Sequence, residues 1–167
     1  MTVDLPPDTA DVAWLDRDQQ HSWRSFIVGT TLLMDRLDRD LRERHHLALP
    51  EYEILVRLSE ATEGRTRMAV LAASLSHSRS RVTHTVARLE KAGLVRRSSC
   101  LSDGRGVEAQ ITEKGWDALR AAAPTHVAGV RAFLVDLVSE EDFAAVGRVF
   151  DAVADKLIDA NPAADIR

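Results

Sequence analysis

The sequence has only one cysteine, Cys100, so no disulfide can form within the chain. No apolar run approaches the roughly 18 to 20 residues that a membrane-spanning helix needs. The first eleven residues are acidic and lack the basic start and apolar core of a signal peptide, which predicts a cytoplasmic protein without a membrane partner. Glycine-rich phosphate loops, HExxH pairs and G-x-S-x-G elbows are also missing, so we do not expect an enzyme.

The chain as a whole has no excess of positive charge, since 22 lysines and arginines stand against 26 aspartates and glutamates, a formal net charge of −4. From Arg65 to Arg105, however, nine basic residues stand against only Glu90 and Asp103, so this segment carries +7 and the remainder −11. A local basic patch in an acidic protein is typical of a phosphate-binding surface. A solvated arginine-rich surface without a ligand would give the same count, so the placement of the charges decides between the two.

Apolar periodicity predicts a mainly helical chain with one small β-hairpin, an α+β fold. A long helix is expected from near Trp14 to about His45, with apolar residues spaced three and four apart along one face. Pro50 fits the first turn of a second helix, which ends before Gly64. The apolar positions of the long helix are Trp23, Phe26, Ile27, Thr30, Leu33, Met34, Leu37 and Leu41.

A helix-turn-helix pattern follows. Met68 to Leu75 predicts a short helix, and the polar turn after it places Ser78 at the N-cap of a fourth helix that ends at Gly93. Leu94 to Ser99 and Val107 to Ile111 then predict two strands joined by a glycine-containing loop. This order of elements is typical of a winged helix, with the hairpin as the wing.

Helical periodicity resumes at Thr112 and continues to the end of the chain. Pro124 falls inside the pattern and predicts a kink or a break. The sequence Ser139-Glu140-Glu141-Asp142 resembles a capping box that opens a last helix. Apolar residues at helical spacing in that helix are Phe143, Val146, Phe150, Val153 and Leu157.

The fourth helix separates its apolar and polar residues cleanly. At 100° per residue, Val82, Val86 and Leu89 define a buried side. The opposite side is small, hydroxylic and basic, as a helix entering the major groove requires. It carries Ser80, His84, Ala87, Arg88 and Lys91, with Arg81 and Thr83 at its flanks. An ordinary exposed face is the alternative, but such faces usually mix glutamate with lysine, and here only Glu90 is acidic.

These motifs together resemble the MarR-type winged-helix transcription regulators, from about Trp14 onward. The resemblance is carried by Leu71-Ala72-Ala73-Ser74-Leu75, Ser78-Arg79-Ser80-Arg81-Val82-Thr83, Arg88-Leu89-Glu90-Lys91-Ala92-Gly93-Leu94-Val95-Arg96-Arg97, Asp103-Gly104-Arg105-Gly106 and Ile111-Thr112-Glu113-Lys114-Gly115. It implies that Arg105, at the tip of the wing, enters the minor groove and that Asp103 orients its guanidinium. It also implies a winged helix-turn-helix flanked by N- and C-terminal dimerisation helices.

The resemblance sets the expected organisation. Residues 1–12 are a flexible tail, 13–47 a dimerisation helix, 48–112 the DNA-binding region, 113–161 the C-terminal dimerisation helices and 162–167 a second tail. We expect a homodimer that binds double-stranded DNA at a pseudo-palindromic operator, acts as a repressor and is released by a small anionic or phenolic ligand. The expected DNA contacts are Ser78, Arg79, Ser80, Arg81, Thr83, His84, Arg88, Lys91, Arg97, Asp103 and Arg105.

Candidate ligand contacts are Trp23 and Arg24, an aromatic plate and a guanidinium that together suit an aromatic carboxylate. Core packing for Trp23 and an exposed ion pair for Arg24 are the alternatives. For Cys100, packing is the expected role and redox sensing is the alternative. His45 and His46 face different sides of a helix and the other histidines are scattered, so neither a metal nor a cofactor is expected.

A winged-helix module that only dimerises or binds other proteins is the alternative function. Such a module would not need a basic exposed face on its fourth helix. The charge of +7 and the Asp103 and Arg105 pair at the wing argue for DNA instead.

Overall fold

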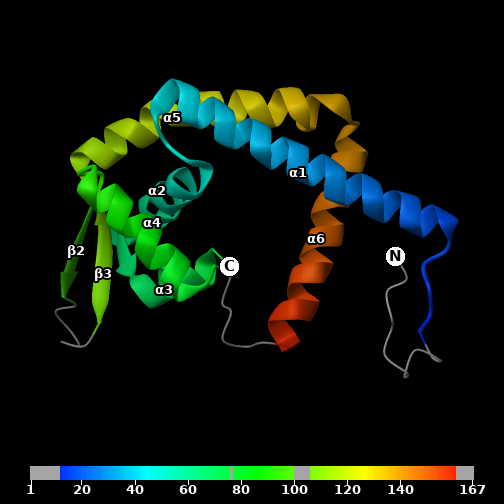
Figure 1. Ribbon diagram of the computed structural model, residues 1–167, viewed down its shortest axis with the longest axis horizontal. Helices are drawn as coiled ribbons and strands as arrows, with labels where there is room; N and C mark the ends of the chain where they lie inside the picture. The colour runs from blue at the N-terminus through cyan, green and yellow to red at the C-terminus, as the bar shows by residue number, and fades with distance from the viewer. Residues whose placement is uncertain (1–11, 76, 100–105, 161–167) are drawn as a thin grey trace, which may run out of the picture. The chain divides into compact units, whose positions relative to one another are not determined.

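The computed structural model describes residues 12–75, 77–99 and 106–160 and confirms a mostly helical fold with a small antiparallel sheet (Figure 1). The chain divides into two compact units between Leu33 and Met34. The helices are α1 (Arg17–His45), α2 (Leu49–Glu60), α3 (Met68–Ser74), α4 (Arg79–Lys91), α5 (Glu113–Phe133) and α6 (Glu140–Ala160). The 3₁₀ turns are η1 (Thr62–Gly64) and η2 (Val135–Leu137), and the strands are β1 (Arg65–Arg67), β2 (Val95–Ser99) and β3 (Val107–Ile111).

Helix α1 begins at Arg17, so the start predicted near Trp14 was three residues too early. The reason is a cap at Asp16, whose Oδ1 accepts hydrogen bonds from the N–H groups of Asp18 at 2.9 Å and Gln19 at 2.8 Å. A carboxylate that binds the free N–H groups of the first turn also complements the positive end of the helix dipole. The cap therefore fixes the first residue of the helix.

The turn between α1 and α2 is held by Asp38. Its Oδ1 accepts the N–H of Leu49 at 2.7 Å, and its Oδ2 accepts the Nε–H of Arg42 at 2.5 Å. Burial alone would raise the pKa of Asp38, but these hydrogen bonds outweigh it and hold the pKa below its ordinary value of 3.8. The ionised carboxylate of Asp38 therefore links the last turns of α1 to the first residue of α2.

Replacing Asp38 with asparagine is expected to lower the free energy of unfolding by about 1 kcal/mol at neutral pH, because the charged hydrogen bonds are lost. The folded-state pKa of Asp38 is depressed, so its contribution is present above pH 3.8 and disappears as the pH falls through that lower value. Urea unfolding of both proteins across this range measures the difference. A difference in the free energy of unfolding that stays constant below pH 3.8 would contradict the assigned role of Asp38.

The winged-helix core is built from the inward faces of α2, α3, α4 and the sheet, which lie together in Figure 1. Its largest fully buried side chains are Ile54, Leu55, Leu58, Leu71, Leu89, Val82, Val86 and Val95, and Leu41 of α1 is buried to the same degree. Each such side chain contributes about 1.5–3 kcal/mol when it leaves water. In α2, Tyr52, Leu55 and Leu58 are buried, whereas Val56 is only half-buried.

The sheet has three strands, not the two of the predicted hairpin. β2 and β3 match the expected wing strands, and β1 adds to the other edge of β3, in the order β1-β3-β2. Arg65 pairs with Gln110, and Gln110 pairs with Arg96 across the second ladder. Sequence patterning missed β1 because three residues with arginine at both ends carry no apolar alternation.

Helix α5 continues through Pro124, so of the predicted kink or break, the break does not occur. Proline removes the hydrogen bond that would reach the carbonyl of Arg120. Both residues lie on the exposed side of the helix, where water can bind the freed carbonyl. At the start of α5, Thr112 accepts the N–H of Gly115 at 3.0 Å as the N-cap.

Ser139 opens α6, as the capping pattern predicted, because its Oγ accepts the N–H of Asp142 at 3.1 Å. The apolar residues of α6 remain exposed in the single chain, from 38% at Phe143 to 63% at Leu157. Within the described residues no single helix is long and apolar enough to cross a membrane. Only the pair Glu113–Leu137 and Glu140–Leu157, bent by 108° at its break, meets the length and composition test together.

Candidate nucleic-acid interface

Helix α4 starts at a side-chain cap. The Oγ of Ser78 accepts the N–H of Arg81 at 3.3 Å, which confirms Ser78 as the predicted N-cap. Just before it, the N–H of His77 donates to the carbonyl of Ala72 in α3 at 3.2 Å. The turn between the two helices is therefore fixed at both ends, and it sets the direction in which α4 leaves the core.

The buried side of α4 is the predicted one. Val82, Val86 and Leu89 are at most 1% exposed. Thr85 is also buried: at 100° per residue it lies only 40° from Leu89, and its hydroxyl donates to the carbonyl of Arg81 at 3.0 Å, which leaves its methyl group to pack. Four buried side chains within about two turns anchor the helix and fix which face points outward.

Gly93 ends α4. It has a positive φ of 75°, its N–H donates to the carbonyl of Glu90 at 2.9 Å, and the N–H of Leu94 donates to the carbonyl of Leu89 at 2.9 Å. These two hydrogen bonds form a Schellman motif, in which glycine takes the left-handed position without strain. The motif turns the chain directly into the wing strand β2.

The N-terminal half of α4 presents an exposed basic and hydroxylic face. Arg79, Ser80, Arg81, Thr83 and His84 are all exposed, as predicted. The hydroxyl of Thr83 donates to the carbonyl of Arg79 at 2.8 Å, so its oxygen remains able to accept. Among the described residues, neither arginine side chain makes an ion pair. This face combines free guanidinium donors with short side chains that permit close approach to a groove.

Arg88 is already engaged. Its Nε lies 3.0 Å from Oε1 of Glu51, and the other oxygen of that carboxylate accepts the N–H of Ala48 at 2.8 Å. Glu51 therefore joins the start of α2 to the last turn of α4. A base contact by Arg88, expected from the wheel, would require its guanidinium to leave this partner or to share it.

Arg97 is engaged as well. Its Nε and backbone N–H donate to the carboxylate of Glu90 at 2.9 and 3.1 Å. The hydrogen bond from the Arg97 side chain holds the pKa of Glu90 below its ordinary value. Glu90, the one acidic residue of α4, therefore links α4 to the wing strand β2. Lys91, on the same last turn as Arg88, is exposed.

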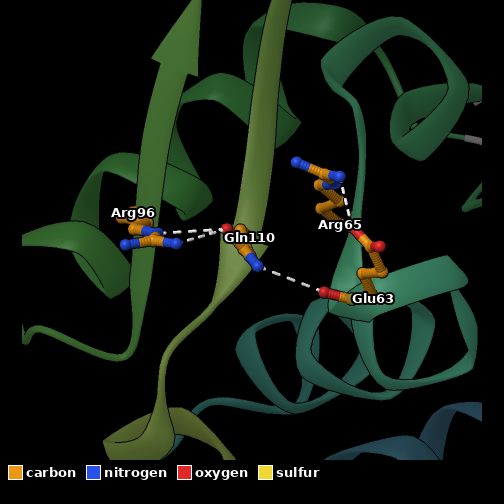
Figure 2. A network of polar contacts seen from close by, with 4 residues as sticks. All are labelled: Glu63, Arg65, Arg96 and Gln110. Atoms are coloured by element: carbon orange, nitrogen blue, oxygen red, sulfur yellow. Dashed lines mark hydrogen bonds and ion pairs between the residues drawn. The ribbon is translucent and has the colours of Figure 1, made fainter. Parts of the chain in front are cut away.

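The outer face of the sheet carries a polar network that sequence reasoning missed. Arg96 donates to Oε1 of Gln110 from Nε at 3.1 Å and from a terminal nitrogen at 2.7 Å, and Gln110 donates to the carbonyl of Glu63 at 3.2 Å (Figure 2). Arg65 pairs with the carboxylate of Glu63. Strand alternation could have placed Arg96 and Gln110 on one face, but their link to Glu63 depends on the unforeseen strand β1.

Four predicted site residues remain, namely Asp103, Arg105, Trp23 and Arg24. Asp103 and Arg105, like Cys100, lie outside the described residues. Trp23 packs on Phe26 with ring centroids 5.7 Å apart, and Arg24 donates to Gln20 at 3.3 Å. No cluster of histidine, cysteine and carboxylate side chains suited to a metal occurs in the described parts of the chain. His45 instead contacts Thr125 of α5, with 2.7 Å between Nε2 and Oγ1.

Comparison with known proteins agrees with this geometry. The sequence profile of the MarR family matches residues 47–107, the part that contains α2, α3, α4 and β2. The HTH-type transcriptional regulator PecS of Dickeya dadantii (strain 3937) is 31% identical over 127 residues, which are 70% of this chain and 73% of PecS.

Two crystal structures of MarR family transcriptional regulators from Streptomyces coelicolor are similar over nearly their whole length. Sco3205, solved in complex with DNA, is 41% identical with a TM-score of 0.86 and covers 89% of this chain and 92% of its own. AbsC is 40% identical with a TM-score of 0.83 and covers 87% of this chain and 98% of its own. The similarity thus extends beyond the winged helix to the flanking helices.

Proposed function

Because this chain belongs to the MarR family of transcriptional regulators, we propose that it is a homodimeric repressor that reads a pseudo-palindromic operator through α4. A small anionic or phenolic ligand releases it from DNA. The flanking helices join the two copies, and the wing tip at Arg105 enters the minor groove beside each α4.

The observation that carries the proposal is the exposed start of α4, where Arg79 and Arg81 stand without ion-pair partners in the described chain, on a helix locked by four buried side chains. Arg88 and Arg97, in contrast, are each paired with a carboxylate. Unneutralised guanidinium groups on a rigid helix gain most from phosphate oxygens and guanine edges. The DNA complex of Sco3205 supports the same use of this fold.

Dimerisation is supported by the apolar residues of α6. Phe143, Val146 and Val153 are 38%, 40% and 45% exposed in the single chain, at spacings that place them along one side of the helix. A second copy related by a two-fold axis would cover this stripe and give each chain the same contacts. It would also place the two α4 helices about 34 Å apart, one turn of DNA, as a pseudo-palindrome requires.

The test compares two alanine variants on a set of operators that differ at single base pairs. His84→Ala is expected to change the order of preference among operators by about 1–3 kcal/mol, because its ring faces base edges. Arg105→Ala is expected to weaken binding to all of them by a similar factor, since minor-groove contacts depend little on sequence. Fluorescence anisotropy with labelled duplexes measures both.

Lys114→Ala is a matched control, because this exposed side chain donates to the carbonyl of Ala92 at 2.7 Å and has no proposed contact with DNA. Its operator preferences should equal those of the unmodified protein. Equal losses on every operator for His84→Ala would show that α4 holds DNA without reading its sequence.

A further inference from the structure

Glu51 lies where the first turn of α2 meets the last turn of α4. Its Oε1 is 3.0 Å from Nε of Arg88, and its Oε2 accepts the N–H of Ala48 at 2.8 Å. The side chain of Glu51 is only 15% exposed, whereas that of Arg88 is 62% exposed. Both oxygens of a largely buried carboxylate are therefore engaged, and Glu51 is a fixed partner for a mobile, exposed guanidinium.

Glu51 is held in place by groups other than Arg88. It is the third residue of α2 and accepts the N–H of the N-cap residue Ala48, as the glutamate of a capping box does. Arg42 of α1 is near as well, since its pKa is raised first by a hydrogen bond to Asp38 and, to a lesser extent, by the charge of Glu51. The position of the carboxylate therefore does not depend on Arg88 alone.

The ion pair leaves the end of the Arg88 side chain available. It engages Nε, and the two terminal nitrogens make no hydrogen bond within the described residues. These two nitrogens carry four N–H groups in one plane, a geometry that matches O6 and N7 of guanine. The contact with Glu51 thus restricts rotation of the guanidinium without occupying the donors that would bind a base.

Arg88 extends the side of α4 that carries His84. The two residues are four positions apart, so they share one side of the helix and lie about 6 Å apart along its axis. Successive bases of one DNA strand are about 3.4 Å apart along the duplex. His84 and Arg88 are therefore spaced to reach nearby positions of one half-site.

The pairing with Glu51 also distinguishes Arg88 from the arginines at the start of α4. Arg79 and Arg81 make no ion pair in the described chain and suit phosphate oxygens, which attract any positive charge. The charge of Arg88 is offset by Glu51, which weakens its attraction to phosphates. What remains is directional hydrogen bonding by a guanidinium whose orientation is set before binding, and this favours one base edge over another.

We propose that Glu51 is a specificity-determining positioning residue, which holds the guanidinium of Arg88 so that its terminal nitrogens bind one guanine in each half-site. Glu51 itself does not touch DNA. The ion pair persists in the complex, where Arg88 is shared between the carboxylate and the base. This inference rests on the proposed function and adds a residue outside α4 to those that determine the operator.

Duplexes that differ at single base pairs from an operator recovered with the full-length protein locate this guanine. It is the position at which the unmodified protein prefers guanine and the Arg88→Ala variant does not. There we expect Glu51→Gln to reduce the preference for guanine about tenfold, and to change preferences at other positions by less than about twofold. Glutamine keeps an oxygen for the N–H of Ala48, so the start of α2 is retained. Fluorescence anisotropy measures each affinity.

Two further variants separate positioning from support of the fold. Glu51→Asp keeps the negative charge but withdraws the carboxylate by one methylene group, so it should lose the same guanine preference and decides the question if Glu51→Gln does not fold. Glu60→Gln is the matched control, because it removes a carboxylate that pairs with Arg57 at 3.1 Å within α2. It should leave every base preference unchanged. Thermal transitions show which variants are folded.

The possible results distinguish this inference from the proposed function. An equal loss on every duplex for a folded Glu51 variant would mean that Glu51 only supports the structure. Tighter binding to every duplex would mean that Glu51 withholds Arg88 from DNA. Either result overturns the inference, as does an Arg88→Ala protein that keeps all base preferences, and the proposed function then still stands. An unmodified protein that binds all duplexes equally would overturn the proposed function itself.

Discussion

Replacing Arg79 and Arg81 together with glutamate is expected to weaken operator binding about a thousandfold, or ~4 kcal/mol. Both arginines are exposed and make no ion pair in the described chain, so the substitutions break no internal contact of their side chains. The new carboxylates would lie where phosphate oxygens are expected, which adds repulsion to the loss of attraction. The variant should keep its helical circular dichroism and its thermal transition.

Arg39 and Arg44 provide a matched control, because they are also exposed and without an ion pair among the described residues. Their joint replacement with glutamate changes the net charge by the same amount, and we expect less than a threefold loss of affinity from the general field alone. Anisotropy titrations at two salt concentrations measure both variants. Equal losses in the two variants would mean that overall charge, and not the α4 face, holds DNA.

Replacing Gly115 with alanine is expected to lower the free energy of unfolding by about 3 kcal/mol, the upper range for overpacking a core. A Cβ atom at this position would lie 2.1 Å from the backbone oxygen of Leu94 and 2.8 Å from a side-chain carbon of Ile111. A backbone oxygen cannot turn aside as a flexible side chain can. The start of α5 would therefore have to separate from the wing strands.

Gly29→Ala is the control for this substitution, because a Cβ there meets nothing within 4 Å. It also lies inside a helix, so alanine should raise stability by up to about 1 kcal/mol through its higher helix propensity. Urea unfolding followed by circular dichroism gives both values. A Gly115→Ala protein as stable as the unmodified one would show that the contact between α5 and Leu94 is looser than the structure indicates.

The faces of α4 were predictable because their signals are local. Helical periodicity separates Val82, Val86 and Leu89 from the basic face, while Ser78 and Gly93 mark the two ends of the helix by their capping chemistry. Wing strands β2 and β3 followed from alternation around a loop for the same reason. Such patterns need only neighbouring residues, and the structure confirms them.

The partners of the basic residues were not predictable, because they come from distant segments. Glu51 reaches Arg88 from another helix, and β1 forms only because residues far along the chain bring β3 beside it. Periodicity assigns a side chain to a face but does not say what meets it there.

The most direct test of the central claim is a pull-down of fragmented genomic DNA by the purified protein, repeated with the Arg79 and Arg81 double glutamate variant. We expect enriched fragments that share a pseudo-palindrome with half-sites about one helical turn apart, and no enrichment by the variant. Enrichment without a shared sequence, or the same fragments recovered by the variant, would contradict sequence reading by α4.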